Sequence, residues 1–121
     1  MPVQRILIVE DSPTDRHLLV DLLTRNGYQV TTAETAEDGL TQSRKLRPDL
    51  IIMDVVLPGA SGYQATRQLS RDQETQGIPV FICSSRTQES DKVWGLRQGA
   101  RDYIPKPVDQ HELLTKIAAL G

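Results

Sequence analysis

Polar side chains that could bind a metal ion and a phosphoryl group follow the short apolar segments of this chain. In chain order they are Glu10, Asp11, Asp54, Ser84, Ser85 and Lys106. Three carboxylates at close range repel one another unless some are protonated or a cation lies among them. A set of oxygen ligands without His or Cys suits a hard ion such as Mg²⁺. A metal with open water positions, beside a lysine and a hydroxyl, is an arrangement that binds phosphoryl groups.

Asp54 is the candidate nucleophile of this set, because carboxylates can form aspartyl phosphates. A simpler interpretation is that acidic residues after strands only cap the next helix. That interpretation suffices for any one of these residues alone. It does not account for four strand ends whose residues share one chemistry.

The elements that must bring these residues together are short strands alternating with helices. Residues 6–9, 50–53 and 80–83 are wholly apolar, which is typical of strands buried on both faces of a parallel sheet. Residues 29–32 and 102–104 are weaker strand candidates.

Five helical patterns separate and follow these strands. Ser12 and Pro13 predict the start of the first helix, and Gly27 predicts its end. The second helix is expected to begin at Thr35 and to end before Pro48. The remaining helices are expected at 62–71, at 89–98 and after Asp109, which forms a capping-box pattern with a glutamate three residues later.

Five strand–helix units predict an α/β fold in which a doubly wound, five-stranded parallel sheet has helices on both faces. In open sheets of this kind the functional site lies beyond the carboxyl ends of the strands. The candidate residues all follow strands, so they should meet at that edge.

Length and composition exclude several classes of protein. A chain of 121 residues suits one domain, 1–121, that must act through its own surface. Lys plus Arg total 14 and Asp plus Glu total 16, a net charge of −2, which argues against a nucleic-acid partner. The single cysteine suits a reducing compartment, and no apolar run reaches the length of a membrane span. We therefore expect a cytoplasmic domain with neither a nucleic-acid nor a membrane partner.

Other phosphate-binding folds fit the sequence poorly. It contains neither G-x-G-x-x-G nor G-x-x-x-x-G-K-[ST]. The loop that follows residues 6–9 is acidic and free of glycine, so it would repel a bare phosphate. A phosphatase of the haloacid-dehalogenase type would need a second Asp two residues after Asp54, where this chain has Val56.

Over its whole length the chain resembles response-regulator receiver domains of the chemotaxis-regulator (CheY-like) type. The resemblance rests on the following residues: Glu10-Asp11, Asp54, Leu57-Pro58-Gly59, Gly62, Ser84, residues 99–103 and Lys106-Pro107. It implies a flavodoxin-like receiver fold with strand order 2-1-3-4-5, an order already described for this type of regulator.

The resemblance also implies a role for each acidic residue. Asp54 would accept a phosphoryl group from a phosphohistidine on a partner histidine kinase of the chemotaxis type. Asp11 and Asp54 would bind Mg²⁺ directly, together with the backbone carbonyl of Val56, and Glu10 would contribute through water.

The remaining motif residues would form the switch. Ser84 would hydrogen-bond the phosphoryl group and Lys106 would pair with its oxygens, with a cis peptide bond before Pro107. Tyr103 would follow Ser84 inward and remodel the face formed by the fourth helix, fifth strand and fifth helix. A downstream protein would read that face.

A narrower similarity concerns the third and fourth predicted helices. Residues 62–69, 91–95 and 97–103 resemble the single-domain receivers of twitching-motility systems, the PilH type. The leading hypothesis is therefore a signalling switch rather than an enzyme, at most a weak autophosphatase, in type IV pilus motility, phototaxis or chemotaxis. A phosphorelay intermediate or phosphate sink, and an interaction module independent of phosphorylation, remain alternatives.

Overall fold

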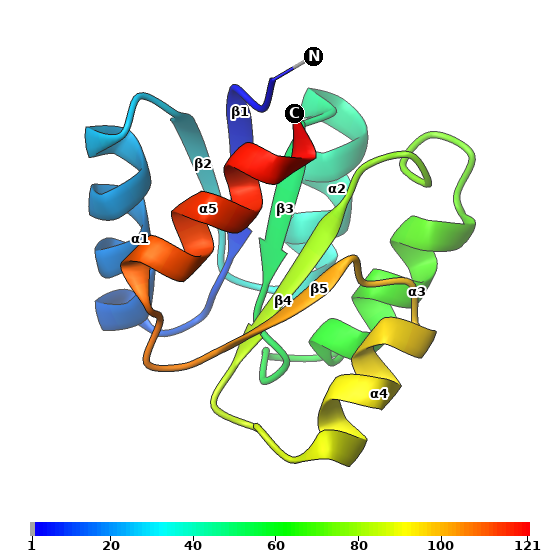
Figure 1. Ribbon diagram of the computed structural model, residues 1–121. Helices are drawn as coiled ribbons and strands as arrows, with labels where there is room; N and C mark the ends of the chain where they lie inside the picture. Colours follow the sequence, from blue (N-terminus) through cyan, green and yellow to red (C-terminus); the bar gives the residue numbers. More distant parts are fainter. Residues whose placement is uncertain (1) are drawn as a thin grey trace.

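The computed structural model describes residues 2–121 as one five-stranded sheet between two layers of helices (Figure 1). The strands are β1 (Arg5–Val9), β2 (Gln29–Ala33), β3 (Leu50–Met53), β4 (Val80–Ser84) and β5 (Asp102–Pro105). The helices are α1 (Pro13–Arg25), α2 (Ala36–Leu46), α3 (Gly62–Arg71), α4 (Glu89–Arg97) and α5 (Gln110–Leu120).

All strand pairs are parallel, and the order across the sheet is β2-β1-β3-β4-β5. This confirms the predicted fold class and strand order. β5 is an edge strand, where the missing N–H of Pro105 can be tolerated. The central strands β1 and β3 are buried apart from Arg5, as expected for apolar runs covered on both faces.

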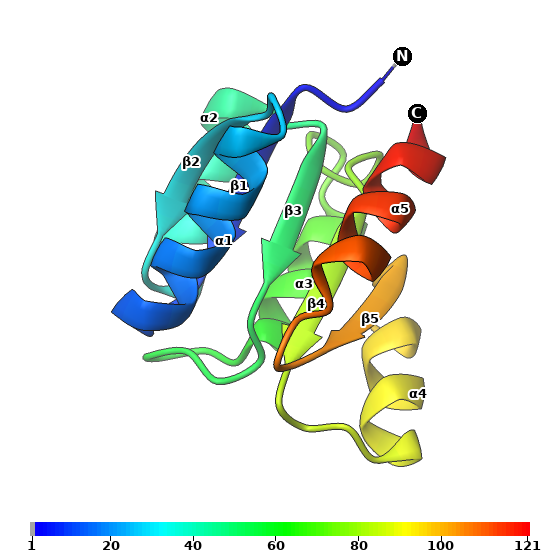
Figure 2. The ribbon, with the colours of Figure 1, turned by 60° about the vertical axis from the view of Figure 1, so that its left-hand side comes forward.

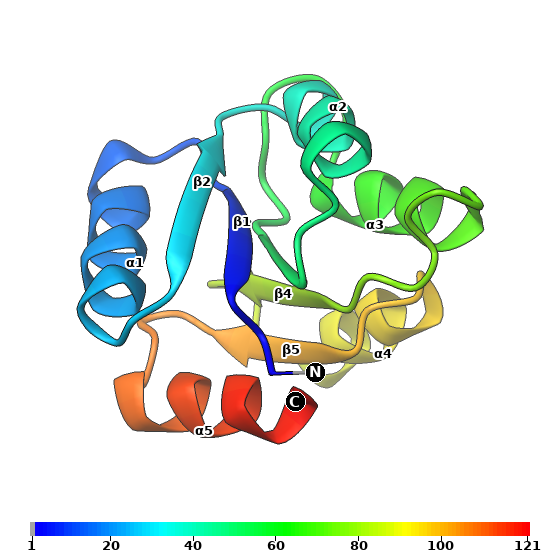
Figure 3. The same ribbon diagram turned by 90° about the horizontal axis from the view of Figure 1, so that it is seen from above.

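The helices divide into two layers. Figures 2 and 3 show α1 and α5 on one face of the sheet and α2, α3 and α4 on the other. Alternate residues of β1 supply the cores on the two faces of the sheet. Ile6 and Ile8 belong to the core beneath α1 and α5, whereas Leu7 and Val9 belong to the core beneath α2 and α3.

Capping residues explain where the first two helices begin. The Oγ of Ser12 accepts a hydrogen bond from the backbone N–H of Asp15 at 3.3 Å, and Pro13 occupies the first helical position. The second helix begins at Ala36, so its predicted start at Thr35 was wrong by one residue. Thr35 is the N-cap, and its extended backbone lies outside the helix.

The other predicted bounds were also off by one residue at some ends. Four strands extend one residue beyond their predicted ranges: β1 to Arg5, β2 to Ala33, β4 to Ser84 and β5 to Pro105. α4 ends at Arg97, with Gln98 as its C-cap. None of the helices in residues 2–121 is both long and apolar enough to cross a bilayer.

Candidate functional site

An open cleft lies beyond the carboxyl ends of β1, β3 and β5. Its lining consists of Glu10, Asp11, Ser12, Asp15, Asp54, Val56, Ser85, Lys106 and Pro107. The structure therefore brings together the polar residues that the sequence placed at separate strand ends. Ser84 lies beneath this surface, fully buried at the end of β4.

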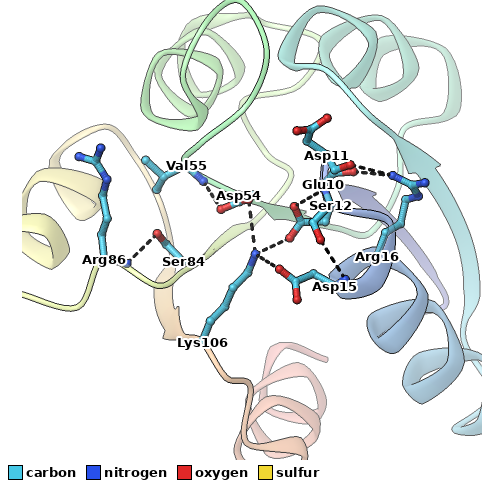
Figure 4. Close-up of polar contacts among 10 residues, drawn as sticks. All are labelled: Glu10, Asp11, Ser12, Asp15, Arg16, Asp54, Val55, Ser84, Arg86 and Lys106. Carbon is cyan, nitrogen blue, oxygen red and sulfur yellow. Dashed lines mark hydrogen bonds and ion pairs between the residues drawn. The ribbon is translucent and has the colours of Figure 1, made fainter.

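Lys106 is the centre of the charged groups in the cleft (Figure 4). Its Nζ lies 2.5 Å from Glu10 Oε1, 3.0 Å from Asp15 Oδ2 and 3.4 Å from Asp54 Oδ2. The backbone position of Lys106 is fixed by its N–H, which donates to the carbonyl of Ser84 at 2.9 Å. The Lys106–Pro107 peptide is cis, as the family resemblance implied.

Burial and charge set the protonation of the two most enclosed groups. Burial raises the pKa of Glu10, and Asp54 raises it further, against the opposing effect of Lys106. Burial alone would lower the pKa of Lys106, but its hydrogen bonds to Glu10 and Asp15 outweigh that effect and raise it. Lys106 is therefore a permanent cation at neutral pH.

Asp54 is held with one carboxylate oxygen turned toward Lys106. Its N–H donates to the carbonyl of Val9 at 3.0 Å, which aligns it with the end of β1. Its Oδ1 accepts the N–H of Val55 at 2.8 Å, so Oδ2 is the oxygen that faces the cleft. The side chain is 12% exposed, enough for a small reactant to reach it.

The backbone of Gly62 packs closely against that of Asp54. A Cβ added at Gly62 would lie 1.9 Å from the carbonyl oxygen of Asp54, so only glycine fits. The N–H of Gly62 also donates to the carbonyl of Val55 at 2.8 Å. The loop after β3 is thereby folded back against the acceptor.

The oxygen groups assigned to a metal ion line one cleft but do not form a closed coordination site. Asp11 and Val56 are exposed, and Arg16 donates to the main-chain carbonyls of Glu10 and Asp11 at 3.1 and 3.3 Å. Within residues 2–121, no three His, Cys, Asp or Glu side chains are close enough to hold a metal as they stand. The donor set consists of carboxylate and carbonyl oxygens, which fit a hard cation once the Asp11 carboxylate turns into the cleft.

A chain of hydrogen bonds runs from the cleft to β5. Ser84 Oγ accepts the N–H of Arg86 at 3.1 Å, and the hydroxyl of Tyr103 donates to the carbonyl of Arg86 at 2.8 Å. The Tyr103 hydroxyl also lies 3.2 Å from that of Tyr63 on α3. Tyr103 is thus already buried in this structure, with its ring against Gly95 of α4, whereas the resemblance implied inward movement after Ser84.

Sequence reasoning missed Asp15 and Tyr63 as members of the site. Asp15 is the third residue of α1, and Ser12 caps that helix immediately after the acidic pair. That spacing was a usable signal, because the first turn of α1 starts at the strand end that carries the site. Tyr63 had no such signal, since its partner Tyr103 is 40 residues away in the chain.

Three residues with potentially reactive side chains are not part of the cleft: Cys83, His17 and His111. Burial raises the pKa of the Cys83 thiol to about 12, so it remains a neutral apolar group in β4. His17 and His111 are exposed on α1 and α5.

Comparison with known proteins identifies the type of domain. Residues 6–118 match the family model described as response regulator receiver domain. Protein PilH of Pseudomonas aeruginosa is 53% identical over 116 residues, which cover 96% of this chain and 96% of PilH. The phosphate regulon transcriptional regulatory protein PhoB of Escherichia coli is 41% identical over 97% of this chain but only 51% of PhoB. The chain spans about half the length of PhoB, and likewise of AfsQ1 of Streptomyces coelicolor and RpaA of Synechocystis.

Solved structures show the same fold. The receiver domain of sensor histidine kinase PA1611 from Pseudomonas aeruginosa, with magnesium coordinated in its active-site cleft, superposes with a TM-score of 0.90 at 29% identity. It covers 98% of this chain and 97% of that domain. Chemotaxis protein CheY4 of Vibrio cholerae superposes with a TM-score of 0.90 at 26% identity, over 98% of this chain and 99% of CheY4.

Proposed function

The chain belongs to the response regulator receiver domain family, and from this premise we propose that it is a single-domain response regulator that is phosphorylated on Asp54. A histidine kinase is the proposed phosphoryl donor. The product acts as a signalling switch through protein contacts rather than as an enzyme with a turnover substrate.

The proposal rests on one observation, the environment of Asp54 Oδ2. That oxygen faces a cleft and lies 3.4 Å from the Lys106 ammonium. Unlike Oδ1, it accepts no main-chain hydrogen bond from residues 2–121. A partly exposed carboxylate oxygen beside a fixed cation is placed to attack phosphorus and to share the resulting charge.

The chemistry requires only one bond to form and one to break. Asp54 Oδ2 attacks the phosphorus of the donor's phosphohistidine, and the P–N bond breaks as the P–O bond forms. The electron pair of the P–N bond stays on the imidazole nitrogen, which takes up a proton. Lys106 offers its charge to the phosphoryl oxygens, and Ser84, buried at the end of β4, is the proposed hydroxyl that turns toward them.

Mg²⁺ is the proposed cofactor, bound by Asp11 and Asp54 with the carbonyl of Val56, and by Glu10 through water. It would offset the nearly two negative charges that a phosphoryl group adds to a cleft already rich in carboxylates. The raised pKa of Glu10 reflects that excess of negative charge as well as burial.

The output would travel along the Ser84–Arg86–Tyr103 hydrogen bonds to the α4-β5-α5 face. Val93, Trp94 and Leu96 of α4 are between 40% and 49% exposed, which provides apolar contact area for a downstream protein. A displacement of Ser84 would change its hydrogen bond to the N–H of Arg86. It would thereby move the Arg86 carbonyl that accepts from the Tyr103 hydroxyl. The two-state element is therefore the loop 85–88 with α4.

The similarity to PilH supports a role in a chemotaxis-type pathway that controls twitching motility. The 53% identity spans 96% of this chain and 96% of PilH. A kinase of the chemotaxis type is the corresponding proposed partner.

Intact-mass spectrometry after incubation with phosphoramidate and Mg²⁺ tests the proposal. Wild-type protein should gain one phosphoryl group, and Asp54→Asn should gain none. Addition of a histidine phosphotransfer protein then separates the roles: a terminal switch keeps the label, whereas a phosphorelay intermediate passes it on. A wild type that gains no phosphoryl group would leave the interaction-module alternative in its place.

A further inference from the structure

Asp15 is a fourth carboxylate at the cleft, and its side chain has no part in the phosphoryl-transfer scheme above. It lies in the first turn of α1, and its Oδ2 accepts a hydrogen bond from Lys106 Nζ at 3.0 Å. That contact is closer than the 3.4 Å between Lys106 and Asp54. The residue therefore competes with Asp54 for the cation that phosphorylation would need.

The donor capacity of Lys106 is already filled. An ammonium group has three N–H donors, and Lys106 contacts three carboxylates, those of Glu10, Asp15 and Asp54. Phosphorylation converts Asp54 Oδ2 into the ester oxygen and frees one of these donors. A second phosphoryl oxygen can gain a hydrogen bond from Lys106 only if Glu10 or Asp15 gives up its own.

Exposure decides which carboxylate is released. Glu10 is 2% exposed and its second oxygen accepts the N–H of Ser12, so its release would leave a buried charge without its cation. Asp15 is 41% exposed, so water can replace Lys106 as its partner at the smallest cost.

We propose that Asp15 is a positioning residue that holds Lys106 in the unphosphorylated state and is exchanged for a phosphoryl oxygen on activation. The inference rests on the proposed phosphorylation of Asp54. Asp15 lowers the affinity of the site for a phosphoryl group in two ways: it competes for the ammonium, and it adds a negative charge near the incoming anion.

The exchange also reaches α1. Asp15 is the third residue of this helix; its N–H donates to the capping Oγ of Ser12, and its carboxylate accepts a hydrogen bond from Lys106. Release of the carboxylate frees the first turn of α1 from the loop after β5. Phosphorylation would thereby alter a surface on the opposite side of the cleft from α4.

Beryllofluoride, an analogue of the phosphoryl group, provides the test by calorimetric titration at saturating Mg²⁺. Asp15→Asn should bind it more tightly than wild type by on the order of fivefold, as expected for loss of one partly exposed ion pair. Asp15→Ala should show an equal or larger gain. Asp21→Asn is the matched control, because Asp21 lies on the same helix but pairs with Arg25 away from the cleft, and its affinity should equal that of wild type.

A second measurement records the NMR signal of the Lys106 side chain, in metal-free protein and then in the bound state. The ¹⁵Nζ chemical shift of Lys106 should differ between wild type and Asp15→Asn in metal-free protein, and the difference should vanish once beryllofluoride and Mg²⁺ are bound. Equal or weaker affinity of Asp15→Asn, or a difference in shift that persists in the bound state, would overturn the inference. Failure of the wild type to bind beryllofluoride would instead refute phosphorylation of Asp54, and the inference with it.

Discussion

The hydroxyl of Tyr103 donates a 2.8 Å hydrogen bond to the main-chain carbonyl of Arg86, two residues beyond the buried Ser84. The edge strand β5 is thus tied to the loop that leaves the site on β4. Because the N–H of the same Arg86 donates to Ser84 Oγ, one peptide segment links the two side chains.

The bond between Tyr103 and Arg86 can be tested by removing one hydroxyl. Tyr103→Phe should lower the free energy of unfolding by about 1 kcal/mol, because it leaves the Arg86 carbonyl and the Tyr63 hydroxyl without this partner. Tyr63→Phe is the matched control and should cost less, since its bonds of 3.2 and 3.4 Å are longer. Urea denaturation measures both, and amide exchange of residues 85–88 should quicken only in Tyr103→Phe. An equal or larger cost for Tyr63→Phe would contradict this assignment.

Ser84 should matter for signal transmission more than for stability. Ser84→Ala removes the acceptor of the Arg86 N–H, but Arg86 is exposed, so water can replace it and the free energy of unfolding should change by less than about 1 kcal/mol. The fluorescence change of Trp94 on addition of beryllofluoride and Mg²⁺ should largely disappear, whereas Ser84→Thr, which keeps the hydroxyl, should retain it. An undiminished change in Ser84→Ala would exclude Ser84 from the transmission path.

Gly62 should be the glycine least tolerant of a side chain among those near the site. Gly62→Ala places a Cβ 1.9 Å from the Asp54 carbonyl oxygen, so the loop must shift and we expect a loss of about 3–5 kcal/mol of unfolding free energy. Gly77→Ala is the control, because nothing lies within 4 Å of its added Cβ and its φ is not positive. Thermal denaturation of the two variants should differ widely; similar melting temperatures would refute the close approach at Gly62.

The contrast between Asp54 and Asp15 shows how far the sequence could predict this site. Asp54 follows an apolar run, and strand ends of a parallel sheet meet at one edge, so its place near Glu10 and Lys106 follows from the pattern alone. Asp15 lies within a helix, where an acid in the first turn is ordinarily explained by the helix dipole. Its contact with Lys106 depends on how α1 packs beside the loop after β5, which no local pattern encodes.

The fold was more fully predictable than the state of the switch. The apolar runs and caps located the elements to within one residue, because burial on both faces and capping are local signals. The inward position of Tyr103 depends on hydrogen bonds to Tyr63 and Arg86 and on the room left by Gly95. These are tertiary contacts between residues far apart in the chain, and a single sequence does not reveal them.

Far from the cleft, Asp49 should stabilise the fold in a way that is lost in acid. Its Oδ2 accepts the N–H groups of Gln4 and Arg5 at 3.0 and 2.9 Å, and these bonds lower the pKa of Asp49. A lowered pKa means that the stabilisation is present above pH 3.8, the ordinary value, and is lost as the pH falls through the folded-state pKa.

Asp49→Ala should therefore lower the free energy of unfolding by about 1 kcal/mol at pH 7, and by progressively less as the pH falls below 3.8. Urea denaturation from pH 7 to pH 3 measures this. Asp49→Asn keeps an acceptor oxygen and should cost less at pH 7. A cost of Asp49→Ala that is constant across this range would show that ionisation of Asp49 is not linked to folding.

The most direct measurement of the central claim is to locate the phosphoryl group on the chain. Protein incubated with phosphoramidate and Mg²⁺ is treated with borohydride, which reduces an aspartyl phosphate to homoserine, and the peptides are sequenced by mass spectrometry. We predict homoserine at position 54 in the wild type and no reduced residue in Asp54→Asn. Reduction at Glu10, Asp11 or Asp15, or no reduced residue in the wild type, would contradict the assignment of Asp54 as the acceptor.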